Sequence, residues 1–397
     1  MIFPLPSVRV SRKGEERLRF GHPWVFGDDL RDVPEGMPAG QWVRVLSRAG
    51  EFLGTATANL DARLSLRRVS REEVEPSAEF IEGRLRDALS RRSEVGLTKE
   101  SAFRVMYSEG DFLPGLIVDR YGGILSVQIL TAGMENVREA ILDTLERVMA
   151  PRLIYERSEG SGRRLEGLDD NRGVVRGGGS PEEEIEADGI RFLVNVETGP
   201  KTGFFIDQRE NRRIVRDLAE GKDVLDGFCA DGGFGLYALA GGARSVFAID
   251  SSRRAVETAH ANAGRNGFIS RWEGDTADMF QALRELAASG RRFDLVVLDP
   301  PSFTKTRDGR ERALRGYQDI NRIGLAILSP GGLLATSSCT QLIDMTKWKE
   351  ALAGAAADAG VDLELVAMGR QPADHPILLA APETEYLKFA VYRKRTP

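Results

Sequence analysis

Cysteine and histidine are scarce in this sequence. The chain holds two cysteines, Cys229 and Cys339, and three histidines, His22, His260 and His375. Two cysteines so far apart exclude a disulfide framework and a cysteine-based structural zinc site. Because the histidines are scattered along the chain, a histidine-ligated metal site is not expected either. We therefore predict chemistry that uses no metal ion.

Long apolar runs are also absent. No stretch approaches about 18 uncharged apolar residues, and residues 1–10 contain neither a long apolar core nor a small-residue cleavage site. These features predict a soluble, untargeted, cytoplasmic protein with no membrane partner. The formal net charge of −5 argues against a protein that binds nucleic acid indiscriminately through a strongly positive surface.

The length of 397 residues exceeds what one hydrophobic core usually serves, so we expect several domains. Residues 1–73 read as short strands broken by turn residues, which is typical of a small β-rich domain. Residues 74–188 mix helical and strand patterns and predict a central small α+β domain with a linker. In residues 189–397, apolar runs alternate with helical stretches, as a parallel sheet requires. The predicted fold class is therefore α/β, with a C-terminal doubly wound Rossmann-like domain.

Two details of the first 188 residues are predicted from periodicity. Residues 134–149 show the spacing of one amphipathic helix. Residues 158–186 are rich in glycine and charge, which predicts mobile loops and a linker.

Positive charge is concentrated near the N-terminus. Residues 1–71 hold twelve Lys or Arg against eight Asp or Glu, an excess of four positive charges in an acidic protein. In the strand expected at residues 63–69, Arg63, Arg67 and Arg68 are predicted to point outward. Together with Trp24 they suit looped or single-stranded RNA, whose bases stack on rings and whose phosphates meet guanidinium groups. The alternative is that the Trp24 ring belongs to the core of the β-rich domain.

A glycine-rich turn follows the predicted strand at residues 223–225. Asp226 closes this strand, and Gly227, Phe228, Gly232 and Gly233 lie in the turn, where the backbone can approach a ligand closely. A carboxylate at this position suits the cationic amino-acid end of S-adenosylmethionine better than it suits a pyrophosphate.

Two further acidic residues follow the next predicted strands. Asp250, followed by Ser251, ends residues 246–249 and is placed to accept hydrogen bonds from a ribose. Asp275 follows the next helix and suits an adenine amino group. The three acidic positions together predict a site for S-adenosylmethionine.

A buried strand at residues 293–298 ends in Asp299, Pro300 and Pro301. Ligands of open α/β sheets bind at the carboxyl ends of strands, so we expect Asp299 where a target base lies. The two prolines restrict the backbone, which then presents the carboxylate in one geometry. Such a loop indicates a base methyltransferase but does not identify the methylated atom.

Cys339 follows the late strand at residues 333–337 and should neighbour the Asp299 loop. Attack of a thiolate on carbon 6 of cytosine turns carbon 5 into a nucleophile that can accept a methyl group. Cysteine suits this task because its thiolate is reactive near neutral pH when nearby charges lower its pKa. Cys229 is expected to be a small packing residue.

These motifs resemble the RlmI-type family of large-subunit (23S) ribosomal RNA 5-methylcytosine methyltransferases. The resemblance covers nearly the full length, and it includes residues 21–26 at the entry to a PUA domain, residues 109–120, residues 201–209, Asp299-Pro300-Pro301 and Ser338-Cys339. It implies a PUA-like RNA-binding domain at 1–73 and a class I S-adenosylmethionine-dependent methyltransferase domain at 189–397.

The resemblance also implies roles for individual residues. Cys339 is the nucleophile, and Asp299 positions the cytosine. The implied cofactor contacts are Asp226, Gly227, Phe228, Gly232, Gly233, Asp250, Ser251, Asp275, Asp299, Phe204 and Gln208. The implied RNA contacts are Pro300, Pro301, Lys201, Thr202, Arg63, Arg67 and Trp24. The expected partner is 23S ribosomal RNA or a large-subunit assembly intermediate, and a homodimer is left open.

Ser302 stands where many RNA 5-methylcytosine enzymes carry a second cysteine, so the base that removes the carbon-5 proton is unassigned.

Three alternative functions remain at this point. A guanine N-methyltransferase would use the same cofactor and the Asp299 loop. A non-catalytic RNA-binding assembly factor would retain only the fold. A dinucleotide-dependent oxidoreductase is disfavoured, because the turn lacks a regular Gly-x-Gly-x-x-Gly spacing.

Overall fold

The computed structural model describes residues 5–100, 102–304 and 306–395, and the chain forms two compact units. The first unit extends to Ile185 and also includes Val194–Phe204 and Ala373–Thr384. The second unit comprises Glu186–Leu193, Phe205–Pro372 and the residues from Glu385 onward. The division into three domains at residues 73 and 188 remains our proposal.

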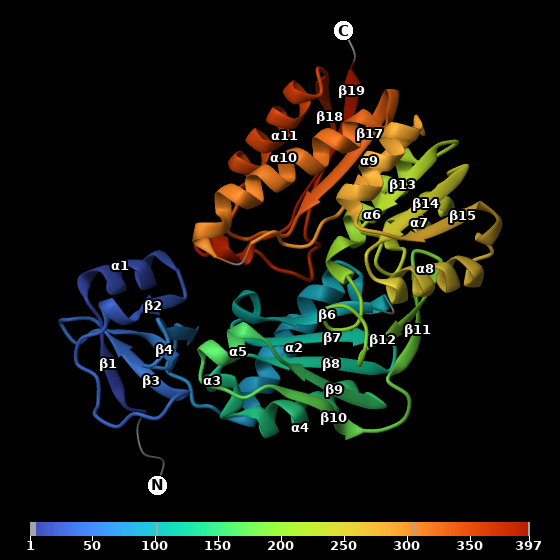
Figure 1. Ribbon diagram of the computed structural model, residues 1–397. Coiled ribbons are helices and arrows are strands. Elements are labelled where there is room, and N and C mark those ends of the chain that lie inside the picture. Colours follow the sequence, from blue (N-terminus) through green and yellow to red (C-terminus); the bar gives the residue numbers. More distant parts are fainter. Residues whose placement is uncertain (1–4, 101, 305, 396–397) are drawn as a thin grey trace. The chain divides into compact units, whose positions relative to one another are not determined.

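The first unit begins with a five-stranded sheet in the order β1-β3-β4-β5-β2 (Figure 1). Its strands are β1 (Ser7–Arg9), β2 (Trp24–Phe26), β3 (Gln41–Leu46), β4 (Phe52–Ala58) and β5 (Leu64–Ser70). The sequence interpretation missed helix α1 (Arg12–Phe20), which Ser11 caps by accepting a hydrogen bond from the Gly14 amide. Valines and leucines from the strands and from α1 form the core of this sheet.

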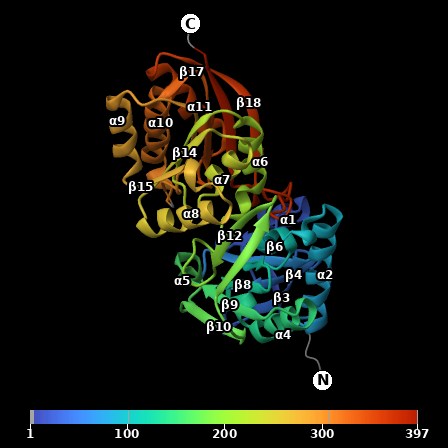
Figure 2. The same cartoon turned by 90° about the vertical axis from the view of Figure 1, so that its right-hand side faces the viewer.

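A second five-stranded sheet, in the order β10-β9-β8-β7-β6, forms the rest of the core of this unit (Figure 2). Its strands are β6 (Ala102–Tyr107), β7 (Leu116–Tyr121), β8 (Ile124–Ile129), β9 (Leu153–Ser158) and β10 (Asn171–Gly177). Apolar side chains of α2 (Ala78–Glu94) and α4 (Arg138–Met149) pack on it. The predicted helix at 134–149 is in fact two helices, α3 (Ala132–Glu135) and α4.

The prediction of loops and a linker at residues 158–186 is wrong. This segment contains α5 (Ser161–Leu165), β10, and β11 (Glu182–Ala187), which pairs with β12 (Ile190–Asn195). A Cβ at Gly177 would lie 2.1 Å from the carbonyl oxygen of Arg152. This glycine therefore permits close approach to a neighbouring backbone, and composition alone does not distinguish that use of glycine from a flexible loop.

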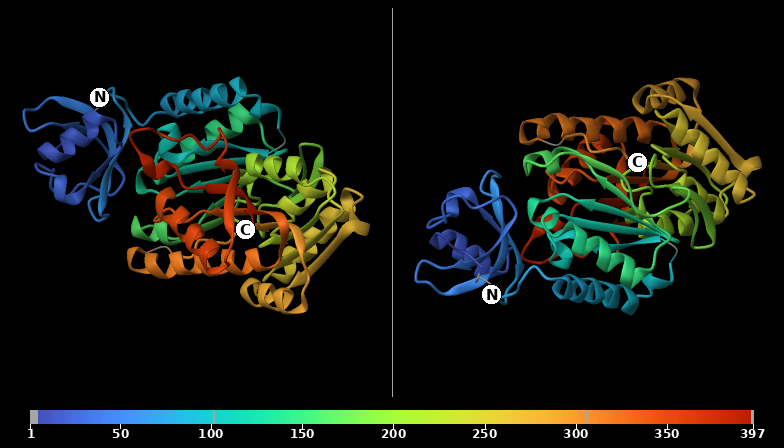
Figure 3. Two further views of the ribbon diagram at one scale, coloured as in Figure 1. Left: turned by 90° about the horizontal axis from the view of Figure 1, so that it is seen from above. Right: turned by 90° about the horizontal axis from the view of Figure 1, so that it is seen from below.

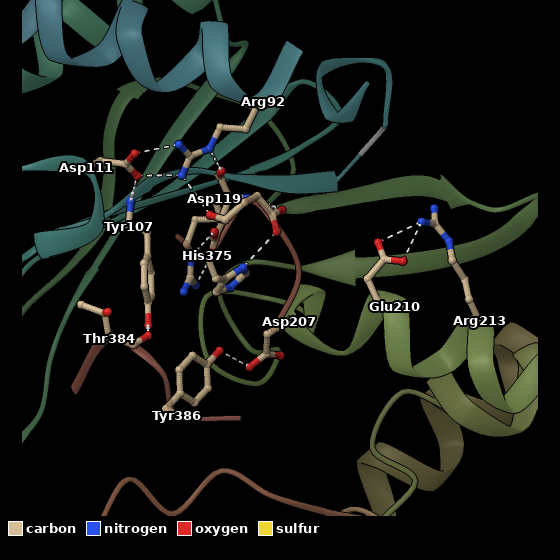
Figure 4. Close-up of polar contacts among 12 residues, drawn as sticks. Arg92, Tyr107, Asp111, Asp119, Asp207, Glu210, Arg213, His375, Thr384 and Tyr386 are labelled. Atoms are coloured by element: carbon tan, nitrogen blue, oxygen red, sulfur yellow. Dashed lines mark hydrogen bonds and ion pairs between the residues drawn. The ribbon is translucent and has the colours of Figure 1, made fainter. Parts of the chain in front are cut away.

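Buried ion pairs lie inside the first unit (Figure 4). Nη1 and Nη2 of Arg92 donate to the two carboxylate oxygens of Asp111, each at 2.7 Å. Nη2 of Arg92 also donates to the backbone carbonyl of Asp374 at 2.9 Å. The hydroxyl of Tyr107 donates to the carbonyl of Thr384 at 3.1 Å. Segment 373–384 therefore folds as part of the first unit, although the residues on both sides of it belong to the second.

The second unit is built on a seven-stranded sheet in the order β15-β14-β13-β16-β17-β19-β18 (Figure 1). Its strands are β13 (Asp223–Gly227), β14 (Ser245–Asp250), β15 (Trp272–Thr276), β16 (Phe293–Leu298), β17 (Leu328–Ser338), β18 (Asp362–Arg370) and β19 (Lys388–Arg395). The strands from β15 to β17 in this order are parallel, and β19 is antiparallel to both of its neighbours.

Helices cover both faces of this sheet, as the doubly wound prediction requires (Figures 1 and 3). One layer holds α6 (Arg209–Leu218), α7 (Gly233–Ala240) and α8 (Arg253–Arg265). The other holds α9 (Met279–Ser289), α10 (Arg310–Ala326) and α11 (Met345–Asp358). Leu225, Val296 and Leu334 contribute to the core beneath this second layer. None of the helices in the described part of the chain is long and apolar enough to cross a membrane.

Candidate active site

Asp226 is the penultimate residue of β13 and is completely buried. Its Oδ2 accepts a hydrogen bond from the Gly235 amide at 2.7 Å, whereas its buried Oδ1 has no hydrogen-bond partner among the described residues. The pKa of Asp226 is raised to about 7, mainly by burial and also by the nearby carboxylates of Asp299 and Asp250, whereas the Gly235 hydrogen bond and Arg212 oppose this shift. A buried acceptor of this kind is costly unless a ligand donates to it.

The turn after β13 is held in an unusual backbone conformation. Phe228 has φ of 62° and Ala230 has φ of 46°, in the left-handed region that favours glycine, and Gly232 has φ of 83°. A Cβ at Gly233 would lie 2.5 Å from Nε of Arg212. Strained positions of this kind cluster at ligand sites. The turn thus forms a cradle in which the backbone itself faces the ligand.

The carboxylate of Asp250 holds the same turn in place. Its Oδ2 accepts from the Ala230 amide at 3.0 Å and its Oδ1 accepts from the Ser252 amide at 2.9 Å. Ser251 and Asp275 are exposed, and Asp275 accepts a hydrogen bond from the Thr276 amide at 2.8 Å. Parallel pairing of β14 with β15 brings these residues to the same edge of the sheet as Asp226.

These residues fit S-adenosylmethionine. The unpartnered oxygen of Asp226 suits the ammonium group of the amino-acid end, and Asp250 suits ribose hydroxyls. The glycines of the cradle allow neighbouring side chains to pack directly against its backbone, as Arg212 does at Gly233, which fixes the turn beside Asp226.

Asp299 follows β16, next to the end of β17. The side-chain amide of Gln208 donates to its Oδ1 at 2.9 Å, and the Ser337 hydroxyl donates to the same oxygen. Asn211 donates to Oε1 of Gln208 at 2.6 Å, which turns the Gln208 amide nitrogen toward Asp299. Gln208 lies in the short helix η4 (Ile206–Gln208) and is buried. The carboxylate is therefore held from two elements.

Cys339 follows the last residue of β17 and is partly exposed. The next residue, Thr340, shares hydrogen bonds with the hydroxyl of Tyr317 at 2.8 Å and with that of Ser302 at 3.1 Å. Ser302 follows Pro301, so these bonds link the turn of Cys339 to the Asp-Pro-Pro loop. The Ser337–Asp299 bond makes a second link between the two segments.

Lys388 was missed in the sequence analysis. It lies opposite Ser338 in the β17–β19 pairing and is 6% exposed. Its Nζ donates to the carbonyls of Thr340 at 3.2 Å and Tyr386 at 2.9 Å, and no described carboxylate forms an ion pair with it. Burial lowers the pKa of Lys388, and Cys339 is the largest of the influences that oppose this shift. The available signal was a lysine at the start of the apolar run Phe389–Val391.

Three of the predicted site residues that lie in the first unit come from segment 201–204, namely Lys201, Thr202 and Phe204. The hydroxyl of Thr202 donates to Asp119 at 2.6 Å and shares a hydrogen bond of 2.9 Å with Tyr121. The Tyr121 hydroxyl also donates to the carbonyl of Phe204 at 3.2 Å. Lys201 is exposed. Thr202 and Phe204 thus make polar contacts inside this unit, and their roles at the pocket remain predictions.

The predicted RNA-facing arginines differ in environment. Arg63 is exposed, whereas Arg67 forms ion pairs with Glu109 at 3.1 Å and with Glu166 at 2.9 Å. Trp24 donates to the same Glu109 at 3.0 Å. The prediction that Arg68 points outward is wrong, because it is 5% exposed and its guanidinium donates to two backbone carbonyls. Adjacent residues of a strand point to opposite faces of the sheet, so Arg67 and Arg68 cannot both point outward, and Arg68 lies on the buried side with Leu66.

The fold and the cofactor cradle together define an S-adenosylmethionine-dependent methyltransferase. The family of that description matches residues 111–381, and a PUA-like domain family matches residues 8–71. The predictions of fold class and cofactor are thereby confirmed.

Comparison with curated proteins specifies the family. Ribosomal RNA large subunit methyltransferase I of Aeromonas hydrophila is 38% identical and is aligned over 98% of this chain and 99% of its own length. The protein of the same name from Vibrio cholerae is 39% identical over 96% of this chain and 98% of its own. The chain belongs to this methyltransferase family.

Solved structures share the fold over almost the whole chain. A protein from Streptococcus mutans described as an S-adenosylmethionine-dependent methyltransferase has a TM-score of 0.84, with 22% identity, over 98% of this chain and 100% of its own. A protein described as a methyltransferase in complex with S-adenosylhomocysteine has a TM-score of 0.86 with the same identity and coverage. At this identity the likeness concerns the fold.

Proposed function

We propose that this protein methylates carbon 5 of cytosine in large-subunit (23S) ribosomal RNA, with Cys339 as a covalent nucleophile. The observation that carries the proposal is the double link between the Cys339 turn and the Asp-Pro-Pro loop. One link is the Ser337–Asp299 bond, and the other is the contact of Thr340 with Ser302. A reactive sulfur and a fixed carboxylate thereby share one edge of the sheet, where open α/β sheets bind ligands.

The proposed chemistry begins with the thiolate. The Cys339 sulfur bonds to carbon 6 of the ring, and the displaced electron pair makes carbon 5 nucleophilic. S-adenosylmethionine, when bound, supplies the electrophilic methyl group that carbon 5 accepts. Loss of the carbon-5 proton restores the carbon 5–carbon 6 double bond and expels the thiolate. Asp299 orients the cytosine throughout these steps.

The surroundings of Cys339 support a thiolate. A buried ammonium that interacts with the sulfur stabilises its anionic form, and Lys388 is the cation in that position. The carbonyls of Thr340 and Tyr386 hold the ammonium in place. We propose Lys388 as the residue that keeps Cys339 ready to react near neutral pH.

Ribosomal RNA as the substrate is supported by two findings. Relatives that are 38–39% identical over nearly the whole chain bear the name ribosomal RNA large subunit methyltransferase I. The first unit carries a PUA-like domain. If the target cytosine is stacked or paired, it must be flipped out, at a cost of a few kcal/mol.

The test is a Cys339→Ala variant, assayed on ribosomal RNA from cells that lack the gene. We expect the variant to bind S-adenosylmethionine but to form no 5-methylcytosine, as read by mass spectrometry of nuclease fragments. The unmodified protein run in parallel gives the modified base and its position. Methylation by Cys339→Ala at a near wild-type rate would exclude the covalent mechanism, and methylguanine in the fragments would indicate guanine N-methylation. Failure of the unmodified protein to bind the cofactor in calorimetry would favour a non-catalytic assembly factor.

A further inference from the structure

Three arginines of the first unit have no acidic partner. Arg68 donates only to the carbonyls of Leu18 and Gly21, and Arg84 donates to the carbonyl of Val69 at 2.9 Å. Arg71 is exposed and has no hydrogen bond or ion pair with any described residue. Arginines elsewhere in this acidic protein are commonly paired, as Arg67 is with Glu109 and Glu166. None of the three therefore forms an ion pair with a described carboxylate, although the charges of Asp87 and Glu72 partly offset that of Arg84.

The three arginines line one pocket of about 290 Å³. Its lining consists of Arg68, Ser70, Arg71, Glu72, Arg84 and Phe112. Three cations thus face one carboxylate, which leaves a net positive charge. The buried Nε of Arg84 has no hydrogen-bond partner in the described part of the chain, so one donor remains unsatisfied.

Burial lowers the pKa of two of these arginines, Arg68 and Arg84. Burial, helped by the neighbouring charge of Arg71, lowers the pKa of Arg68 to about 10. Burial is also the main reason that the pKa of Arg84 is lowered. An anion in the pocket would relieve the repulsion and accept from the unsatisfied donor.

An aromatic ring completes the pocket through a strained backbone. Phe112 has φ of 59° and ψ of 25°, a left-handed conformation that is an outlier for a bulky residue. Its amide donates to the carbonyl of Glu109 at 3.1 Å, which fixes the turn. The ring lies 5.3 Å from the guanidinium carbon of Arg84. Strain that a glycine would avoid is typical of a position whose side chain has a function.

The geometry points to a binding site for one phosphodiester of single-stranded or looped RNA, with the adjacent base stacked on Phe112. Guanidinium groups complement phosphate oxygens in charge and in hydrogen-bond geometry. An aromatic ring beside them accepts any base, which is how proteins hold unpaired RNA. The volume is at the lower end of ligand pockets, about 300–1,000 Å³, and so suits a phosphate with one ring. This inference rests on RNA being the substrate and adds a contact away from the methyl-transfer residues.

The test measures the affinity for a fluorescein-labelled, mixed-sequence single-stranded RNA oligonucleotide by anisotropy at several salt concentrations. Arg71→Ala should weaken binding about three- to tenfold and reduce the slope of log K against log salt by about 0.7, the value for one lost phosphate contact on a single strand. Phe112→Gly should weaken binding about fivefold or more with an unchanged slope, because it removes stacking and no charge. Glycine suits the left-handed backbone, so this variant should keep its fold.

The matched control is Arg86→Ala. Arg86 lies on the same helix as Arg84 but is 64% exposed and paired with Glu82, so its removal changes the net charge equally. It should leave the affinity and the slope unchanged within about twofold. If both pocket variants bind RNA as Arg86→Ala does, while the unmodified protein still methylates it, the pocket proposal is overturned and the proposed function stands. If the unmodified protein binds no RNA at low salt, both fail.

Discussion

At the scale of single residues, Asp226 links stability to cofactor binding. The unfolded chain ionises this residue above about pH 4, whereas burial in the folded protein raises its pKa to about 7. Folding thus becomes less favourable as the pH rises from about 4 to 7, and the full cost is present above pH 7. The same buried oxygen suits a cationic ligand when it is ionised.

Asp226→Asn should therefore stabilise the free protein and abolish its cofactor binding. We expect the free energy of unfolding in urea to rise by about 1 to 3 kcal/mol at pH 8 and by almost nothing at pH 4. In the unmodified protein, calorimetry should show that affinity for S-adenosylmethionine falls about tenfold per pH unit below about pH 7, as the carboxylate becomes protonated.

The control for this substitution is Asp362→Asn, at the exposed start of β18. It should change neither the stability at pH 8 nor the affinity. Full retention of cofactor affinity in Asp226→Asn would contradict the assignment of this carboxylate to the ammonium group.

At the scale of elements, strand pairing explains how Lys388 comes to lie at the turn that contains Cys339. The antiparallel register between β17 and β19 sets Lys388 opposite Ser338, although the two residues lie 50 positions apart in sequence. Backbone carbonyls hold the ammonium, so its position depends on the strands rather than on a salt bridge. The pairing of β17 with β19 thus determines where the ammonium group of Lys388 lies relative to the turn of Cys339.

Lys388→Met should raise the pKa of the Cys339 thiol by about 1 to 2 units. The measurement is the pH dependence of alkylation by iodoacetamide, read by mass spectrometry of the peptide that contains Cys339. Lys388→Arg should restore much of the reactivity because it keeps the charge. Lys394→Met is the matched control, since Lys394 lies on the same strand and also donates to two carbonyls. A pH midpoint that is equal in the two methionine variants would exclude an electrostatic role for Lys388.

The arrangement of the strands also explains which parts of the site could be predicted from the sequence. Residues 226, 250 and 299 each follow an apolar run, and parallel strands bring their carboxyl ends to one edge, so the acidic site could be predicted from local pattern. Lys388 and Ser337 could not, because their contacts depend on register between distant strands or on side-chain direction in a loop. The burial of Arg68 was predictable in part, because alternation requires one of the neighbours Arg67 and Arg68 to face inward, but it does not say which one. The strands of residues 171–187 were hidden by the glycines of that segment.

At the scale of the whole molecule, the chain leaves one compact unit and returns to it. Segment 373–384 belongs to the first unit, while Pro372 and Glu385 belong to the second. Asp374 anchors the segment, because its Oδ2 accepts from the Arg104 amide at 2.9 Å and its carbonyl accepts from Arg92 at 2.9 Å. The carboxylate is fully buried, so the strand β6 that carries Arg104 relies on a residue about 270 positions later.

Asp374→Ala tests this dependence. Removing a buried charged acceptor leaves the Arg104 amide unpaired, which should cost about 1 to 3 kcal/mol of stability in the first unit. Hydrogen exchange followed by mass spectrometry should therefore quicken in β6 and in β7, which pairs with it. Exchange in β13 and β14 of the second unit, and the affinity for S-adenosylmethionine, should stay unchanged. Asp61→Ala, an exposed carboxylate in the first unit, is the control. Equal hydrogen-exchange rates in Asp374→Ala and Asp61→Ala would mean that β6 keeps its strand pairing without Asp374. Segment 373–384 would then contribute nothing to the stability of the first unit.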